Sequence, residues 1–114
     1  MQRARPILAS LAGLGVLAVA TPTLAATPVL TGTVGPGFTI KLAAKPTKAG
    51  KYTFVINDKA SIHNFHLVGP GVNKKLTSVS GTGVSKPVTL ALAKGSYKYF
   101  CDLHHSLKGS FKVS

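Results

Sequence analysis

Short apolar segments separated by glycine and proline make up most of the chain beyond its first 26 residues. Within these segments β-branched and aromatic residues alternate with polar ones, which is typical of half-buried strands. No part of this region shows convincing helical periodicity. The pattern therefore predicts an all-β Greek-key sandwich of seven or eight strands. The candidate strands are Val29–Val34, Phe38–Leu42, Lys51–Asn57, Asn64–Val68, Leu76–Val79, Lys86–Leu92, Ser96–Cys101 and Ser110–Val113.

Alternation near the C-terminus indicates where the single cysteine points. Tyr97, Tyr99 and Cys101 fall on one face of the segment, and Lys98 and Phe100 fall on the other. Because lysine belongs in water, the face that carries Cys101 should line the core. Cys101 is therefore predicted to point inward, and Phe100 to lie on the outer face.

The same reasoning separates two upstream histidines. His63, Phe65 and Leu67 share one face, whereas Asn64 and His66 lie on the other. Since Phe65 and Leu67 resemble core residues, His63 is predicted to point inward. His63 thus becomes the candidate partner of Cys101. His66 is expected to face outward and to have no metal role.

The N-terminus resembles a secretory leader. Arg3 and Arg5 precede an apolar stretch over Ile7–Ala20, and small residues follow it. This pattern predicts a signal peptide over residues 1–26, cleaved after Ala25 or Ala26, and a mature domain over residues 27–114. A retained membrane anchor is the alternative, but the apolar run is short for a span. We expect an exported protein of the periplasm, cell envelope or medium, with no membrane span after cleavage.

The mature domain is strongly basic. Removing Arg3 and Arg5 lowers the formal charge from +12 to +10, and only Asp58 and Asp102 are acidic. Two acidic residues disfavour paired-carboxylate catalysis. The remaining basic residues are all lysines scattered along the chain, which argues against nucleic acid. An acidic protein partner or an anionic surface fits this charge better.

The lone cysteine points to a metal. Cys101 cannot form an internal disulfide, so it is a free thiol, an intermolecular link or a metal ligand. A thiolate with a histidine three positions on and a second histidine upstream suits trigonal copper. Zinc would usually need another ligand. His66 or His105 could supply one, so zinc stays open as an alternative. A cysteine nucleophile would need an orienting third residue, for which nothing argues.

Three motifs together resemble the cupredoxins, the family of plastocyanin, amicyanin and pseudoazurin. They are Gly50-Lys51-Tyr52-Thr53-Phe54, His63-Asn64-Phe65 and the stretch from Gly95 to Val113. The resemblance implies one type 1 copper ion bound by His63, Cys101 and His104. It also implies that Asn64 ties the two ligand loops together. Asp102 is expected beside the ligands as a turn residue that caps local backbone N–H groups.

One position departs from the family pattern. Leu107 stands where the family usually has the axial methionine, and the only methionine is Met1. Leucine cannot donate to copper, so the resemblance implies a three-coordinate site with a raised potential. The rival is that His105 swings in as a fourth ligand, but adjacent residues of a tight loop rarely face one metal.

The implied function is electron transfer without catalysis. His104 would be the partly exposed port, and the apolar rim around it would involve Leu103 and Leu107. The turn at Gly35-Pro36-Gly37 or the one at Gly69-Pro70-Gly71 would complete that rim. Phe100, on the outer face beside Cys101, is a second candidate surface for electron transfer. We expect a monomer that exchanges electrons with redox protein partners. The alternatives are a copper delivery or storage protein and a metal-free sandwich scaffold.

Overall fold

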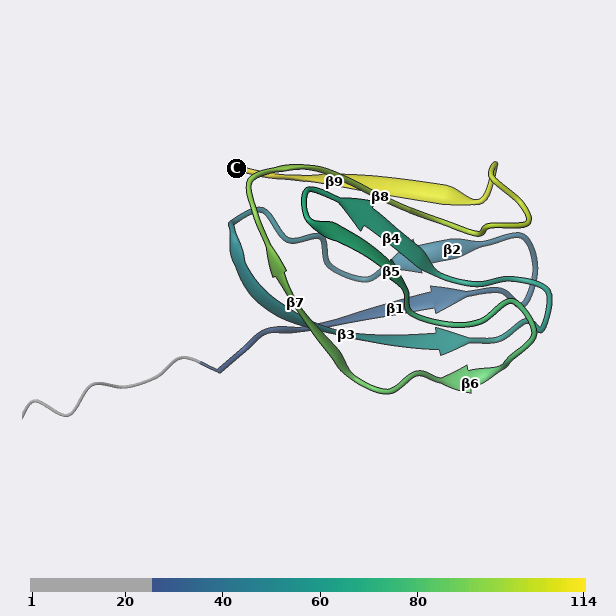
Figure 1. The fold of residues 1–114 in the computed structure, drawn as a ribbon. Helices are drawn as coiled ribbons and strands as arrows, with labels where there is room; N and C mark the ends of the chain where they lie inside the picture. The colour runs from purple at the N-terminus through teal and green to yellow at the C-terminus, as the bar shows by residue number, and fades with distance from the viewer. Residues whose placement is uncertain (1–25) are drawn as a thin grey trace, which may run out of the picture.

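The structure is a computed structural model that describes residues 26–114. The predicted leader lies outside these residues, apart from Ala26. The described chain forms nine strands and no helix (Figure 1). These strands are β1 (Val29–Val34), β2 (Ile40–Leu42), β3 (Gly50–Asp58), β4 (His66–Gly69), β5 (Val72–Lys75), β6 (Gly83–Val84), β7 (Val88–Leu92), β8 (Gly95–Phe100) and β9 (Lys108–Val113).

The strands form two facing sheets, which confirms the predicted β-sandwich. The first sheet has the order β2-β1-β3-β6, and β7 also pairs with β3. In it β1 and β3 run parallel, with Leu30 opposite Phe54. The second sheet has the order β5-β4-β8-β9 and is antiparallel throughout. Since β4 lies beside β8, the segment carrying His63 reaches the segment carrying Cys101.

Three strand assignments were wrong or missing. The predicted strand Leu76–Val79 does not form, and the hairpin partner of β4 is β5, just before it. A single apolar residue, Val72, is all that β5 contributes to the core, so its sequence shows no alternation. The Leu76 segment instead runs beside Phe65, whose backbone accepts from the Leu76 N–H and donates to the Thr77 hydroxyl. The two-residue strand β6 was also not predicted.

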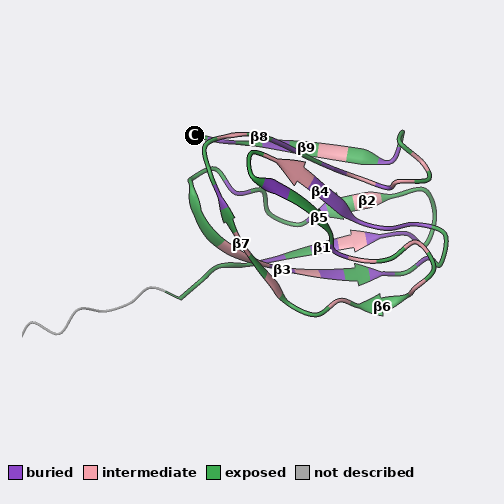
Figure 2. Cartoon of the chain, viewed as in Figure 1, coloured by how far each residue is buried: buried purple, intermediate pink, exposed green. Residues whose placement is uncertain are grey.

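The core lies between the sheets, where the buried segments of Figure 2 face one another. Tyr97, Tyr99 and Cys101 are all buried, as the alternation predicted. Phe65 stacks on Tyr99 with ring centroids 5.0 Å apart. Gly109 leaves room for this stack, because a Cβ there would lie 2.3 Å from the Tyr99 ring. The aromatic column ends at Cys101, so the cysteine is fixed at one end of a packed core.

The connections after β1, β3 and β8 gather at that same end of the sandwich (Figure 1, right). Gly35 opens the β1–β2 loop with φ 75°, and a Cβ there would lie 2.6 Å from that of Ala60 in the β3–β4 loop. Only glycine permits both the positive φ and this approach. The three loops are therefore packed together. No helix in the described residues is long and apolar enough to span a membrane.

Candidate metal centre

Three donor atoms meet where these loops gather. His63 lies in the loop between β3 and β4, Cys101 directly follows β8, and His104 lies in the β8–β9 loop. The two Nδ1 atoms are 3.1 Å apart, and the Cys101 Sγ lies 3.7 Å from that of His63 and 3.8 Å from that of His104. His63 and Cys101 have no exposed surface, and His104 is half-buried. The structure thus brings together residues 41 positions apart.

The donor triangle has the size of a trigonal metal site. A point equidistant from the three atoms lies about 2.1 Å from each, close to the roughly 2.0–2.3 Å of metal–nitrogen and metal–sulfur bonds. The described residues contain no other group of three or more histidine, cysteine or acidic side chains that could hold a metal. Two imidazoles and a thiolate suit a borderline or soft ion.

Backbone hydrogen bonds hold the loop that carries two of the donors. The Cys101 N–H donates to the Leu107 carbonyl at 3.0 Å, and the Leu107 N–H donates to the His104 carbonyl at 2.8 Å. The His104 N–H donates to the Cys101 carbonyl at 3.3 Å. This tight winding fixes the three-residue spacing of the donors. It also turns Leu107 inward, where its side chain is 6% exposed.

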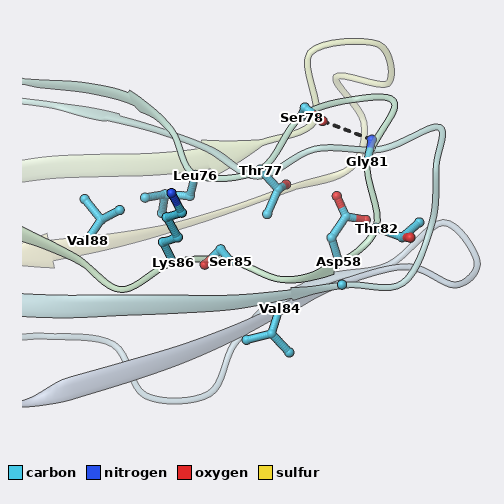
Figure 3. A pocket seen from close by; sticks show the side chains of 11 residues that line it. Asp58, Leu76, Thr77, Ser78, Gly81, Thr82, Val84, Ser85, Lys86 and Val88 are labelled. Carbon is cyan, nitrogen blue, oxygen red and sulfur yellow. Dashed lines mark hydrogen bonds between the residues drawn. The ribbon is translucent and has the colours of Figure 1, made fainter.

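Asp58 shapes the loop that leads to His63. Its Oδ1 accepts from the Ala60 N–H at 3.0 Å, and the Ala60 carbonyl accepts in turn from the His63 N–H at 3.2 Å. Asp58 is 2% exposed, and its Oδ2 has no hydrogen-bond partner among the described residues. The carboxylate borders a cleft of about 280 Å³ that Thr82 also lines (Figure 3). Asp58 is therefore a loop-forming residue behind the donor triangle.

Asn64 and Asp102 link the two ligand-bearing loops. The Asn64 Nδ2 donates to the Asp102 Oδ2 at 2.8 Å, and its Oδ1 accepts from the Asp102 N–H at 2.8 Å. Asn64 is 1% exposed. The paired bonds join the residue after His63 to the residue after Cys101, so they resist separation of the two donors.

The structure corrects two expectations about this neighbourhood. His66 projects from the outer face of its sheet but is buried, with 9% exposed, because Asp102, Asn73 and Phe100 cover it. Asp102 does not cap backbone groups of its own turn. Its Oδ1 instead meets the His66 Nδ1 at 2.8 Å, a contact across 36 positions. Sequence alternation identified the face of His66 but not the side chains folded over it.

The surroundings of Asp102 favour its charged form. The hydrogen bond with His66 lowers the pKa of the Asp102 carboxyl below its usual value, helped by the hydrogen bond from Asn64 and by the positive charges of His66 and Lys75. Partial burial opposes this shift. The Lys75 Nζ lies 3.7 Å from Oδ2 and is largely exposed, so it contributes less. A negative charge is therefore present directly after Cys101.

Phe38 is a site residue that the sequence pattern did not indicate. Its ring centroid lies 5.1 Å from that of His63 and 5.1 Å from that of His104, with interplanar angles of 63° and 88°. The His63 Nε2 is buried without a hydrogen-bond partner in the described chain, so no hydrogen bond at this atom orients the ring. The sequence pattern places Phe38 at the start of a strand instead. An aromatic residue directly after Gly35-Pro36-Gly37 was the only available signal.

Only part of the apolar rim predicted around His104 lies at the site. Leu103 is 60% exposed next to His104, and Phe38 follows the Gly35 turn. Leu107 is buried, so it was wrongly included in an exposed rim. Of the two alternative turns, the one around Pro70 lies away from the site. It contacts Gly95 at the start of β8, at the opposite end from Cys101.

The remaining predicted residues lie beside the centre. Phe100 is half-buried on the outer face of β8, between the rings of His66 and His105 at centroid distances of 4.9 and 5.6 Å. His105 is exposed and forms no part of the donor triangle. Of these two neighbouring histidines, His104 alone belongs to the donor triangle.

Solved structures share this architecture at low sequence identity. Auracyanin A, a "blue" copper protein from Chloroflexus aurantiacus, is 17% identical over 78% of this chain and all of its own, with a TM-score of 0.57. The chain has the cupredoxin fold. A methionine-to-alanine mutant of amicyanin, solved in its Cu(I) form, is 15% identical over 79% of this chain and 86% of its own, with a TM-score of 0.52.

A larger enzyme contains the same cupredoxin fold as one part. The copper-containing nitrite reductase of Thermus scotoductus is 22% identical over 86% of this chain but only 25% of its own, with a TM-score of 0.50. No protein-family model and no curated protein sequence matches the chain. At these identities the likeness establishes the fold, and the function has to be argued from the site.

Proposed function

We propose that the protein is an exported one-electron carrier that binds one type 1 copper ion through His63, Cys101 and His104. The observation that carries this proposal is the donor triangle, whose size and chemistry suit both oxidation states of copper. Copper bound there would supply reversible one-electron chemistry. The copper proteins that share the fold, auracyanin A and amicyanin, support the choice of metal.

The protein's own residues favour electron transfer over catalysis. The bonds between Asn64 and Asp102 hold the donors in place, so little rearrangement is needed when an electron arrives. His63 and Cys101 are fully buried, and Phe38 packs on both imidazoles. This packing limits the access of a substrate to the donors, whereas a catalytic metal site needs an accessible position for one. We therefore propose a carrier and not an enzyme.

Leu107 determines the coordination number and the reduction potential that we expect for the copper site. It occupies the axial position of the family pattern, lies buried in the ligand loop and offers no donor atom. The described residues contain no methionine that could replace it. Without an axial sulfur the cupric form is stabilised less, so we propose a three-coordinate site of high potential.

The surface around His104 suits an acidic redox partner that carries an apolar patch. Phe38, Ile62 and Leu103 are 68%, 51% and 60% exposed, and each touches or directly precedes a donor histidine. Every lysine of the described chain is exposed. A positive surface attracts an acidic partner, and the apolar residues offer it a contact beside the partly exposed imidazole. We propose that the protein acts as a monomer in such encounters.

Export follows from the leader-like N-terminus rather than from the fold. We propose cleavage after Ala25 or Ala26 and action in the periplasm, the cell envelope or the medium. In an oxidising compartment a free thiol is prone to oxidation, and metal binding by Cys101 would protect it.

Copper titration tests the proposal. Adding cupric ion to the purified protein should produce an intense thiolate-to-copper absorption band and a reversible voltammetric wave, and both should vanish in Cys101→Ser. A stable complex with cuprous ion alone would instead indicate delivery or storage. Absence of copper binding would indicate a metal-free scaffold, so either result contradicts the carrier.

A further inference from the structure

A buried carboxylate stands at the end of β3, just before the loop that carries His63. Phe54, Ile56 and Asp58 follow one another on the inner face of this strand, and all three are buried. Aspartate is depleted in strands, and a carboxylate is costly to bury unless it is paired or binds a metal ion. Both ion pairs of the described chain involve Asp102, so no basic side chain of the described residues pairs with Asp58.

Only one carboxylate oxygen of Asp58 has a partner. Its Oδ1 accepts from the Ala60 N–H at 3.0 Å, whereas its buried Oδ2 has no partner among the described residues. An asparagine could accept the same bond from Ala60. What the aspartate adds is therefore a second oxygen that can only accept or bind a cation. Loop formation accounts for Oδ1 and leaves Oδ2 unexplained.

The carboxylate borders a cleft that is lined largely by oxygen-bearing side chains. The cleft has a volume of about 280 Å³, and four hydroxyl side chains line it: Thr77, Ser78, Thr82 and Ser85. In Figure 3 the Asp58 carboxylate points away from β3 towards the loop that carries Gly81 and Thr82. Gly83 lies opposite Asp58 in the strand register and has no side chain to fill this space.

Backbone hydrogen bonds fix some of these hydroxyl oxygens in place. The Ser78 Oγ accepts from the Gly81 N–H at 2.9 Å, and the Ser85 Oγ accepts from the Ile56 N–H at 2.9 Å. Because a hydroxyl oxygen has two lone pairs, each keeps one for a ligand. The cleft thus combines a carboxylate oxygen without a partner with hydroxyl oxygens that are already positioned.

We propose that this cleft binds a hard metal cation, with calcium the best fit and Asp58 as its only carboxylate ligand. Calcium accepts an irregular set of oxygen ligands at about 2.3–2.6 Å. Such a bond is shorter than the roughly 2.7–2.8 Å hydrogen bond from a water, so an ion can reach an oxygen that water hardly touches. The bound ion would join Asp58 to the loop of Ser78 and Thr82 and, through Ala60, would brace the loop of His63.

Titration of the copper-free protein with calcium chloride at constant ionic strength tests this site. In ¹H–¹⁵N NMR the amide signals of Asp58, Ala60 and Thr82 should shift and reach saturation, with half-saturation at about 10⁻⁴–10⁻³ M because one carboxylate gives weak binding. Asp58→Asn can keep the bond to Ala60 and should weaken calcium binding by about tenfold or more. Asp102→Asn removes the only other acidic side chain and is the matched control, which should bind calcium like the unaltered protein.

A second variant keeps the test valid if Asp58→Asn fails to fold. Thr82 is exposed, and its hydroxyl makes no hydrogen bond within the described chain, so Thr82→Val should fold normally and still bind calcium more weakly. Lys86, which also lines the cleft, would repel a bound cation and attract an anion. Lys86→Gln should therefore tighten calcium binding, and weaker binding in this variant would overturn the proposal.

Three further results would also contradict the site. They are the absence of a saturable response to calcium, equal shifts with sodium chloride at the same ionic strength, and undiminished binding by Asp58→Asn. Each would leave ordered water as the partner of Asp58. Since none of the cleft residues belongs to the donor triangle, the calcium titration can fail while the copper titration succeeds, and the reverse also holds.

Discussion

Replacing Asn64 with alanine should strongly destabilise the metal-free protein. The change removes the Nδ2 donor to the Asp102 carboxylate and the Oδ1 acceptor for the Asp102 N–H, both at 2.8 Å. A hydrogen bond to a charged group contributes about 1.5–3 kcal/mol and a neutral one about 0.5–1.5 kcal/mol. The Asp102 side chain is 28% exposed, so water can replace part of the loss. We expect the free energy of unfolding to fall by about 2–3 kcal/mol.

Urea unfolding followed by circular dichroism measures this change. A loss of about 2–3 kcal/mol in a domain of this size corresponds to a fall in Tm of roughly 10–20 °C. Asn57→Ala is the matched control, because Asn57 is exposed on β3, and it should alter stability by no more than about 0.5 kcal/mol. If Asn64→Ala cost less than about 1 kcal/mol, the link between the two loops would not have the energetic role argued from its geometry.

Three further predictions concern the axial position, the docking surface and acid stability. Leu107→Met should lower the potential of the copper-loaded protein in voltammetry, and an unchanged value would contradict the axial assignment. Leu103→Glu should slow electron exchange with an acidic partner and leave the copper spectrum intact, whereas Val84→Glu, similarly exposed on β6, should do neither. Because its folded-state pKa is lowered, Asp102 contributes stability above its unfolded pKa that is lost as pH falls, from about pH 5 downward, through the folded value. Acid unfolding of Asp102→Asn should therefore depend less steeply on pH in this range, and identical curves would refute the assignment.

Much of the fold was predictable because its cause is local. Alternation along Ser96–Cys101 and the surrounding glycines reflects which side chains meet water, and strand β8 has the inward row that this pattern predicts. The hairpin strand β5 was missed for a physical reason as well. Its residues are mostly polar, and hydrogen bonding to β4 rather than an apolar face makes it a strand.

By itself, the sequence determined the sandwich and the chemistry of the candidate donors. A lone cysteine three residues before His104 and an inward His63 are properties of order and spacing along the chain. Only the tertiary structure decided that Phe38 packs on both imidazoles and that His66 is buried against Asp102. These contacts join residues from different loops and strands. Their formation depends on how closely the loops approach one another, and local hydrophobic patterning does not encode that distance.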